Sequence, residues 1–248
     1  MKKFDFQELN FKSGQNNLKG YLYCAKDTTN SSMVLFIHGS GKRIGAKVFQ
    51  DWQTYLVENG ISSFSFDCRG VGGSEGEFDE GSLNNRLIDA ESALDTFLDL
   101  QSLNNTQLLI CGISMGAHVA IRLIEKQPNI RGLILEGAAA YSREAEDKKL
   151  DSEFSAVIQQ ENNWELSPIF SILKNLKIPT ILFYGDKDSV IPEGVKDRYG
   201  EIAGEDSIIT LPNANHSFIV PTSSIDKNNC QEMFEKSLEF IKRIIKDI

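Results

Sequence analysis

The sequence has few of the residues that build metal sites or covalent crosslinks. Its 248 residues include only four cysteines and three histidines. The cysteines lie far apart, with no C-x-x-C pair and no clustering with the histidines. We therefore expect neither a zinc site nor a disulfide framework, and we expect reduced thiols. Cys111, at the end of an apolar run, is expected to be a small buried filler rather than a reactive thiol.

Long apolar runs and basic clusters are also missing. No stretch approaches the roughly 20 apolar residues that span a membrane. The N-terminal segment meets acidic and polar residues before an apolar run of signal-peptide length can form. The formal net charge is −9 and no block is rich in lysine and arginine, so neither a nucleic acid nor an anionic membrane is expected as a partner. These absences lead us to expect a cytoplasmic protein.

The sequence does contain enough apolar residues for one sizeable core. Hydrophobic residues make up 41% of the chain, and a single α/β domain over residues 1–248 is ordinary at this length. Two strand-like segments on either side of a turn-rich cluster predict an N-terminal antiparallel hairpin. After them, apolar runs alternate with amphipathic segments, which predicts a mainly parallel, doubly wound sheet with any site at the C-terminal ends of its strands. The expected strands are 4–11, 18–24, 33–37, 61–66, 108–111, 130–135, 179–184 and 207–211, and the expected helices are 48–59, 83–100, 117–124 and 231–248.

The motif G-I-S-M-G at residues 112–116 joins an apolar run directly to a segment with helical spacing. This arrangement predicts a sharp strand–turn–helix in which Ser114 adopts a strained backbone conformation and small neighbours let strand and helix pass closely. Ser114 would then stand clear of the sheet at a helix N-terminus. The N–H of Met115 would be free to stabilise an oxyanion there. We interpret Ser114 as a nucleophile.

A glycine-containing loop, H-G-S-G at residues 38–41, follows the strand expected at 33–37. Glycines at a strand's C-terminal end let backbone N–H groups point into a site, so the N–H of Ser40 is a candidate for the second oxyanion donor. His38 could be a catalytic base. We favour a bracing role for it through hydrogen bonds to the loop.

Three further loops carry polar residues that could serve such a nucleophile. The D-x-R-G-x-G-x-S segment at 67–74 lacks the spacing of a phosphate-binding loop, so we interpret it as a structural turn. The loop after the strand at 179–184 contains Asp186 and Asp188, two candidate acids, and the loop after the strand at 207–211 contains His216. His118 is a rival base, but it lies one helical turn deeper than Ser114 and is poorly placed to meet its hydroxyl.

Residues 139–177 interrupt the strand–helix alternation. The segment is densely charged at first and then apolar without strand signals, which fits a cap insertion of one to three helices. Because it follows a strand's C-terminal end, we expect it to lie over the site and shape a substrate pocket. The alternative is a helix packed on the side of the sheet. The candidate substrate contacts in this segment are Phe154, Trp164, Ile169 and Phe170.

Taken together, these features resemble the α/β-hydrolase superfamily, and the resemblance covers the chain from Leu18 to the last helix. The loops at 38–41, 67–74 and 185–192 are similar to those of small esterases, including lysophospholipase-like and cinnamoyl-esterase-like members. Two positions depart from those members: Ile113 stands where His is common, and Asn215 stands where Gly is common. Neither change removes a catalytic group.

The resemblance implies a catalytic triad in the chain order Ser114, Asp188, His216. Ser114 would be the nucleophile, His216 its general base and acid, and Asp188 the orienting acid; Asp188 is preferred to Asp186 because it matches the family's position ahead of Val-Ile-Pro. No metal or organic cofactor is implied. The expected partner is a small-molecule carboxylic ester or thioester, cleaved through an acyl-enzyme. Two alternatives stay open: an acyltransferase that uses the same acyl-enzyme, and a non-catalytic ligand-binding homologue, against which the intact triad argues.

Overall fold

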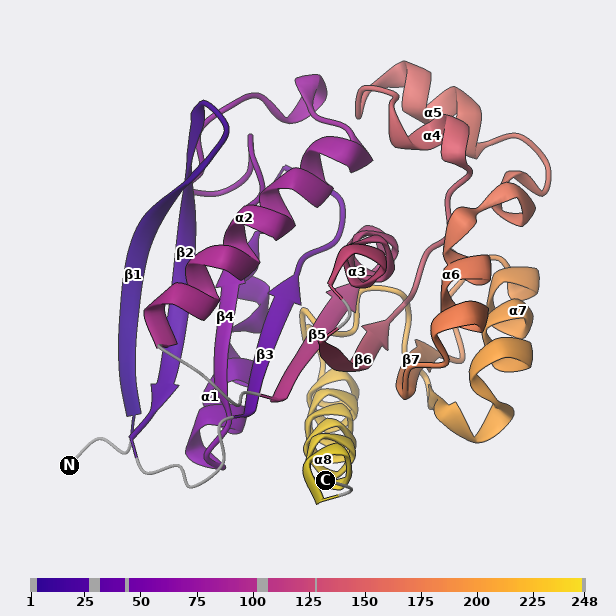
Figure 1. Ribbon diagram of the computed structural model, residues 1–248. Coiled ribbons are helices and arrows are strands. Elements are labelled where there is room, and N and C mark those ends of the chain that lie inside the picture. Colours follow the sequence, from indigo (N-terminus) through magenta and orange to yellow (C-terminus); the bar gives the residue numbers. More distant parts are fainter. Residues whose placement is uncertain (1–3, 27–31, 43–44, 102–106, 128, 247–248) are drawn as a thin grey trace.

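The structure is a computed structural model that describes residues 4–26, 32–42, 45–101, 107–127 and 129–246. Part of the N-terminal segment and the last two residues of the helix predicted at 231–248 therefore lie outside the described residues. In the described part of the chain, eight strands form one sheet in the order β1-β2-β4-β3-β5-β6-β7-β8, with helices on both faces (Figure 1). The mainly parallel, doubly wound sheet predicted from the sequence is confirmed.

The strands lie close to their predicted positions. β1 and β2 pair antiparallel through a tight turn at Gly14 and Gln15, which confirms the N-terminal hairpin. β2 also pairs antiparallel with β4, whereas every later pairing is parallel. The strands are β1 Phe4–Ser13, β2 Asn16–Ala25, β3 Ser32–Ile37, β4 Ser62–Phe66, β5 Gln107–Ile113, β6 Ile130–Glu136, β7 Thr180–Gly185 and β8 Ile208–Leu211.

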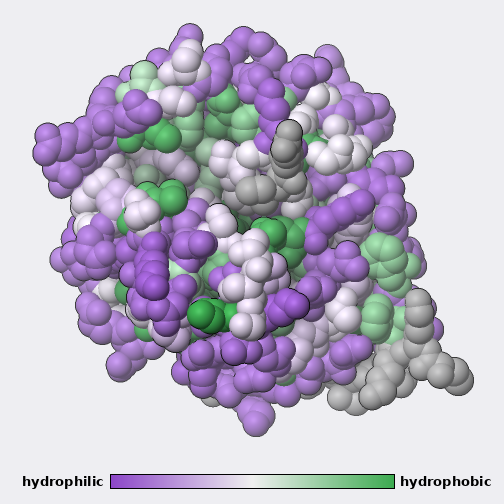
Figure 2. Space-filling model, turned by 180° about the vertical axis from the view of Figure 1, so that it is seen from behind, coloured by the Kyte–Doolittle hydropathy of each residue, from purple (hydrophilic) through white to green (hydrophobic). Residues whose placement is uncertain are grey.

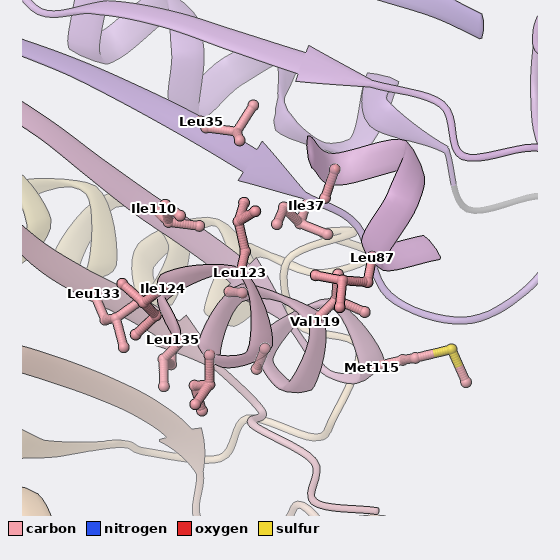
Figure 3. Close-up of a cluster of buried hydrophobic side chains, with 14 of the residues drawn as sticks. Leu35, Ile37, Leu87, Ile110, Met115, Val119, Leu123, Ile124, Leu133 and Leu135 are labelled. Atoms are coloured by element: carbon pink, nitrogen blue, oxygen red, sulfur yellow. The ribbon is translucent and has the colours of Figure 1, made fainter. Parts of the chain in front are cut away.

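The central strands are covered on both faces, which explains why their sequences are continuous apolar runs rather than alternating ones. On β3, Leu35 and Ile37 belong to the core under α2 and α3, while Val34 and Phe36 belong to the core under α1 and α8. Figure 3 shows the first of these cores, in which apolar side chains of α3 lie against those of β3, β5 and β6. The nucleophile candidate therefore stands at the start of a helix that is packed tightly on the middle of the sheet.

The helices α2 and α3 match their predicted spans to within a few residues, whereas α8 begins at Ser224, well before the start predicted at residue 231. The helix expected at 48–59 begins with a 3-10 turn, so its α-helical part is shorter than predicted. Short 3-10 turns of this kind are common at helix ends because they satisfy terminal backbone groups. The helical segments outside 139–177 are η1 Ala46–Phe49, α1 Gln50–Glu58, η2 Phe78–Glu80, α2 Leu83–Gln101, α3 Met115–Lys126, α7 Glu193–Ala203, η4 Glu205–Ser207 and α8 Ser224–Lys246.

The interruption predicted at 139–177 contains α4 Arg143–Glu146, α5 Ser152–Ile158, η3 Asn163–Leu166 and α6 Pro168–Leu176. Its two halves lie in different places. α4 and α5 lie above α3, toward the N-terminal end of α2, whereas α6 runs beside β7 and α7 (Figure 1). The strongly apolar stripe of α6 is buried against α3 and α7 in the main core, an arrangement closer to the alternative of a helix packed beside the sheet than to a cap.

The rear face of the molecule is mainly polar. Figure 2, which shows the molecule from behind, has hydrophilic side chains over most of the face and apolar side chains only in separate patches. Among the helices in the described ranges, none combines the length and the apolar character that a membrane crossing requires.

Candidate active site

Ser114 occupies the predicted sharp turn between β5 and α3. Its backbone has φ 51° and ψ −115°, a conformation that non-glycine residues rarely adopt and that costs about 1–3 kcal/mol. The neighbouring glycines make the turn possible. A Cβ at Gly116 would lie 2.1 Å from the carbonyl oxygen of Ile37, and one at Gly112 would lie 2.6 Å from the carbonyl oxygen of Gly116. The surrounding fold therefore holds Ser114 in a strained position at the C-terminal edge of the sheet.

Three side chains that the sequence analysis singled out meet at this edge. Nε2 of His216 lies 3.0 Å from Oγ of Ser114, and Nδ1 of His216 lies 2.8 Å from Oδ2 of Asp188. Ser114 follows β5, Asp188 follows β7 and His216 follows β8, so the parallel strands bring the three loops to one place. Asp186, the rival acid, is exposed, and the imidazole contacts the carboxylate of Asp188 instead. Asp188 is thus the acid in contact with His216.

The hydrogen bonds of Asp188 keep it ionised and His216 oriented. Burial of the Asp188 side chain would raise its pKa, but the hydrogen bond and charge of His216 outweigh this effect. The backbone N–H groups of Val190 and Ile191 donate to its other oxygen, at 2.8 and 3.2 Å. The net result is a pKa of Asp188 below its ordinary value. Because Nδ1–H of His216 donates to this carboxylate, Nε2 is left to accept the Ser114 proton.

Two backbone N–H groups, those of Ser40 and Met115, belong to segments that adjoin Ser114. The loop at 38–41 packs against the elbow so closely that a Cβ at Gly39 would lie 3.3 Å from Cβ of Ser114. Within the described residues, the N–H of the next residue, Ser40, has no protein acceptor. Met115 is the first residue of α3, where an amide has no acceptor within its own helix. The arrangement leaves both predicted oxyanion donors available.

The other two histidines have structural contacts instead. Nδ1 of His38 lies 2.8 Å from the carbonyl oxygen of Gly39, and its Nε2 accepts the N–H of Cys68 at 3.0 Å. Burial, followed by the charge of Arg86, lowers the pKa of His38 to about 3, so the ring is neutral and braces the loop as predicted. His118 is buried between Glu146, at 3.0 Å, and the N–H of Tyr141. It ties α3 to α4 and does not contact Ser114.

The glycine-rich segment after β4 is a structural turn, as predicted. The buried carboxylate of Asp67 accepts the N–H groups of Ala46 and Gly73 and the hydroxyl of Tyr21. A Cβ at Gly72 would lie 2.3 Å from this carboxylate, so the glycine makes room for it. The carboxylate is fully engaged by the protein and would repel a phosphate.

The four predicted substrate contacts do not lie together. Ile169 is completely buried in the main core, where α6 packs against α3 and α7, so it leaves no surface for a substrate and does not fit its prediction as a direct contact. Trp164 and Phe170 line a groove between α6 and α7 that contains no residue of the Ser114–His216–Asp188 chain. Phe154 packs against Tyr141, whose ring in turn contacts His118. Of the four, Phe154 belongs to the half of the segment that lies above α3.

Two buried charged residues near this site were missed by the sequence analysis. Glu136 ends β6, next to the elbow, and both of its carboxylate oxygens are buried without a hydrogen-bond partner in the described part of the chain. Arg86 lies on the buried side of α2 and contacts the loop at 38–41. The sequence did contain a signal that Arg86 is buried, because at helical spacing it falls among the apolar positions of α2. For Glu136 the only signal was a charged residue at the end of an apolar strand.

Cysteine and metal chemistry find no support in the described part of the chain. The described residues include no group of three or more His, Cys, Asp or Glu that could hold a metal ion. Burial raises the pKa of Cys68 and of Cys230 to about 12, and that of Cys111 well above its ordinary value. These three thiols are therefore protonated at neutral pH and act as apolar fillers.

The chain matches known sequences over most of its length. Residues 28–171 match the profile of a protein family described as serine aminopeptidase, S33. RP471, an uncharacterized protein of Rickettsia prowazekii, is 27% identical over 229 residues, which cover 89% of this chain and 85% of that protein. YfhR of Salmonella typhi is 27% identical over 205 residues, which cover 74% of this chain but 63% of YfhR. The match thus spans less than two thirds of that longer relative.

A solved structure supports the fold. Est1E of Butyrivibrio proteoclasticus, determined with ferulic acid bound, superposes on this chain with a TM-score of 0.72. The superposition covers 94% of this chain and 99% of Est1E, at 18% sequence identity. At this identity the likeness shows a shared architecture.

Proposed function

Because the chain belongs to the family described as serine aminopeptidase S33, within the α/β-hydrolase superfamily, we propose that it cleaves carboxylic esters or thioesters through an acyl-enzyme. The observation that carries this proposal is the unbroken hydrogen-bonded chain from Ser114 through His216 to Asp188. A serine hydroxyl alone is a weak nucleophile at neutral pH, and a histidine within hydrogen-bond distance activates it. The strained elbow that presents Ser114 supports the same role.

The proposed reaction consists of acylation and deacylation, and each catalytic group acts once in each of these steps. Ser114 Oγ attacks the substrate carbonyl while Nε2 of His216 takes the hydroxyl proton. The N–H groups of Ser40 and Met115 bind the oxyanion of the tetrahedral intermediate. His216 then returns the proton to the leaving alcohol or thiol, which departs and leaves the acyl group on Ser114. Water, activated by His216, releases the acid by the reverse sequence.

The negative charge of Asp188 stabilises the cationic form of His216 that arises in this cycle. When His216 accepts the serine proton it becomes a cation, and the carboxylate at 2.8 Å favours that cation. The low pKa of Asp188 means that the carboxylate is already ionised across the neutral range. No proton has to move to Asp188, and its two backbone donors hold it in place.

We further propose that the part of segment 139–177 above α3 caps the acyl or leaving group. It is anchored there from several sides: His118 and Arg122 of α3 both contact Glu146 of α4, at 3.0 and 2.9 Å, and the N–H of Leu150 donates to the carbonyl of Gly81. A cap tied down in this way favours a small or medium substrate over a long lipid chain. Esters of aromatic acids, suggested by the ferulic acid in Est1E, are the first class to test.

The proposal is tested by active-site labelling and a substrate panel. A fluorophosphonate probe should label wild-type protein and not Ser114→Ala, because only an activated serine attacks it quickly. The panel contains p-nitrophenyl esters of short, long and aromatic acids, thioesters and aminoacyl amides, ranked by kcat/KM. Added alcohol or amine acceptors reveal acyl transfer. Labelling that persists in Ser114→Ala, or a wild-type protein inert to every probe and substrate, would refute the proposal.

A further inference from the structure

Arg86 is a buried arginine without a carboxylate partner. It lies on α2 with 2% of its surface exposed, and its buried Nη2 has no hydrogen-bond partner among the residues that the structure describes. Within the described ranges it forms no ion pair; the nearest acid along its helix, Asp89, is already paired with Arg69 at 2.7 Å. Burying a charge without a counter-ion is costly. Such a residue calls for an explanation other than general stability.

The contacts of Arg86 converge on the loop that carries the proposed oxyanion donor. Its Nη1 donates to the carbonyl oxygen of Gly39 at 3.1 Å and lies 3.5 Å from that of His38. The same Gly39 oxygen is 2.8 Å from Nδ1 of His38. Since Nε2 of His38 accepts an N–H from Cys68, its Nδ1 carries the proton and donates. The Gly39 carbonyl is therefore held by two donors, one of them cationic.

The direction of this carbonyl decides where the Ser40 N–H points. The carbonyl oxygen of Gly39 and the N–H of Ser40 belong to one planar trans peptide group, in which they point in opposite directions. Pulling the oxygen toward Arg86 and His38 turns the Ser40 N–H away from them. A charged donor on the oxygen also polarises the peptide and strengthens its N–H as a donor.

We propose that Arg86 is a positioning residue for the oxyanion hole, which it aligns and polarises through the Gly39 carbonyl. This inference rests on the proposed hydrolase function. It gives the buried guanidinium a role in the transition state, when the oxyanion forms, and little role in binding the uncharged substrate. Loss of Arg86 should therefore lower kcat much more than it raises KM.

The test compares Arg86→Met and Arg86→Lys with Arg69→Met. Arg69 is a matched control because it is also a largely buried arginine in the same region, but it pairs with Asp89 instead of the loop. Removing a whole oxyanion donor costs about 10²- to 10³-fold in kcat, so misaligning one should cost about 10- to 100-fold in Arg86→Met. Arg86→Lys keeps a cationic donor and should recover part of this loss. Arg69→Met should lose stability but keep its kcat.

A transition-state analogue separates alignment from general destabilisation. An aryl trifluoromethyl ketone forms a tetrahedral oxyanion on Ser114, whereas the matching product acid does not. Arg86→Met should weaken ketone binding by about the factor lost from kcat and leave product binding within about threefold. If Arg86→Met does not fold, ketone binding and product binding are compared in Arg86→Lys instead.

Two outcomes would overturn the inference. One is an Arg86 variant that keeps kcat and ketone affinity within about threefold of wild type. The other is an Arg69→Met protein whose kcat and ketone affinity fall as far as those of Arg86→Met. Hydrogen exchange at the Ser40 amide gives a readout without turnover, and slower base-catalysed exchange in Arg86→Met is expected because the Gly39–Ser40 peptide loses its cationic donor. If wild-type protein neither turns over esters nor is labelled, the proposed function fails, while unchanged exchange at Ser40 would refute the role of Arg86 separately.

Discussion

Glu136 should make the folded protein less stable as the pH rises. Its side chain is completely buried at the end of β6, and no described residue forms a hydrogen bond with either carboxylate oxygen. Burial, followed by the charge of Asp188, raises the pKa of Glu136 well above its ordinary value of 4.5. In the folded protein Glu136 is therefore protonated at pH values where the unfolded chain has already lost this proton.

The sign and size of the effect follow from proton linkage. Above pH 4.5 the folded state binds more protons at this position than the unfolded state, so the free energy of unfolding falls as the pH rises. The fall is about 1.4 kcal/mol per pH unit and ends once the pH reaches the pKa of Glu136 in the folded state. Between pH 5.5 and 7.5 it amounts to at most about 2.7 kcal/mol. In a chain of this size that corresponds to about 5–10 °C in Tm.

Glu136→Gln removes the titration but keeps the size and shape of the side chain. Urea unfolding, followed by the fluorescence of Trp52 and Trp164, gives the free energy of unfolding at pH 5.5, 6.5 and 7.5. We expect the variant to gain stability relative to wild type as the pH rises. Glu58→Gln, an exposed glutamate on α1, is the control and should leave the pH dependence unchanged.

The difference between wild type and Glu136→Gln across pH is the decisive quantity. Asp188, whose pKa is lowered, contributes stability that is lost only as the pH falls below its ordinary value, outside this range. A stability difference that stays the same at all three pH values would refute the reasoning. It would mean that Glu136 is ionised in the folded protein or finds a partner that solvates it.

Three further predictions concern the proposed site. Ser114→Ala and His216→Ala should each lower kcat by about 10⁴- to 10⁶-fold, and the double variant should lose little more because the groups act as a unit; additive losses would contradict this. Asp188→Asn should be severe and Asp186→Asn mild in steady-state assays, since only Asp188 contacts the imidazole, and the reverse order would identify the wrong acid. Phe154→Leu should change the ranking of the ester panel by about 10-fold or more while labelling persists; an unchanged ranking in a folded variant would exclude Phe154 from the cap.

Much of the fold could be predicted because the spacing of apolar residues along a strand or helix reflects which of its faces are buried. β3 and β5 are continuous apolar runs since helices cover both sides of the sheet, and the hairpin of β1 and β2 is set by a short polar turn. The elbow at Ser114 is likewise local: the strand, the two glycines and the helix that follow one another in the chain are sufficient to define it. Because β5, β7 and β8 run in the same direction, the loops that follow β7 and β8 lie at the same edge of the sheet as the elbow.

The position of α6 could not be settled in the same way. Its sequence shows one apolar stripe, and such a stripe can cover a ligand pocket or a sheet with equal ease. The tertiary structure buries it against α3 and α7, which removes Ile169 from the surface. Only the contacts with segments far along the chain decide between the two.

The sequence by itself determined the sheet, the elbow and the candidate nucleophile, because these depend on neighbouring residues. The tertiary structure decided which of two aspartates on one loop meets His216, since carboxylates two residues apart differ only in the direction they face. It also decided that Glu136 and Arg86 are buried. Burial depends on the segments from elsewhere in the chain that pack against a residue. The free-energy cost of burying the ionisable side chains of Glu136 and Arg86 therefore cannot be read from the sequence.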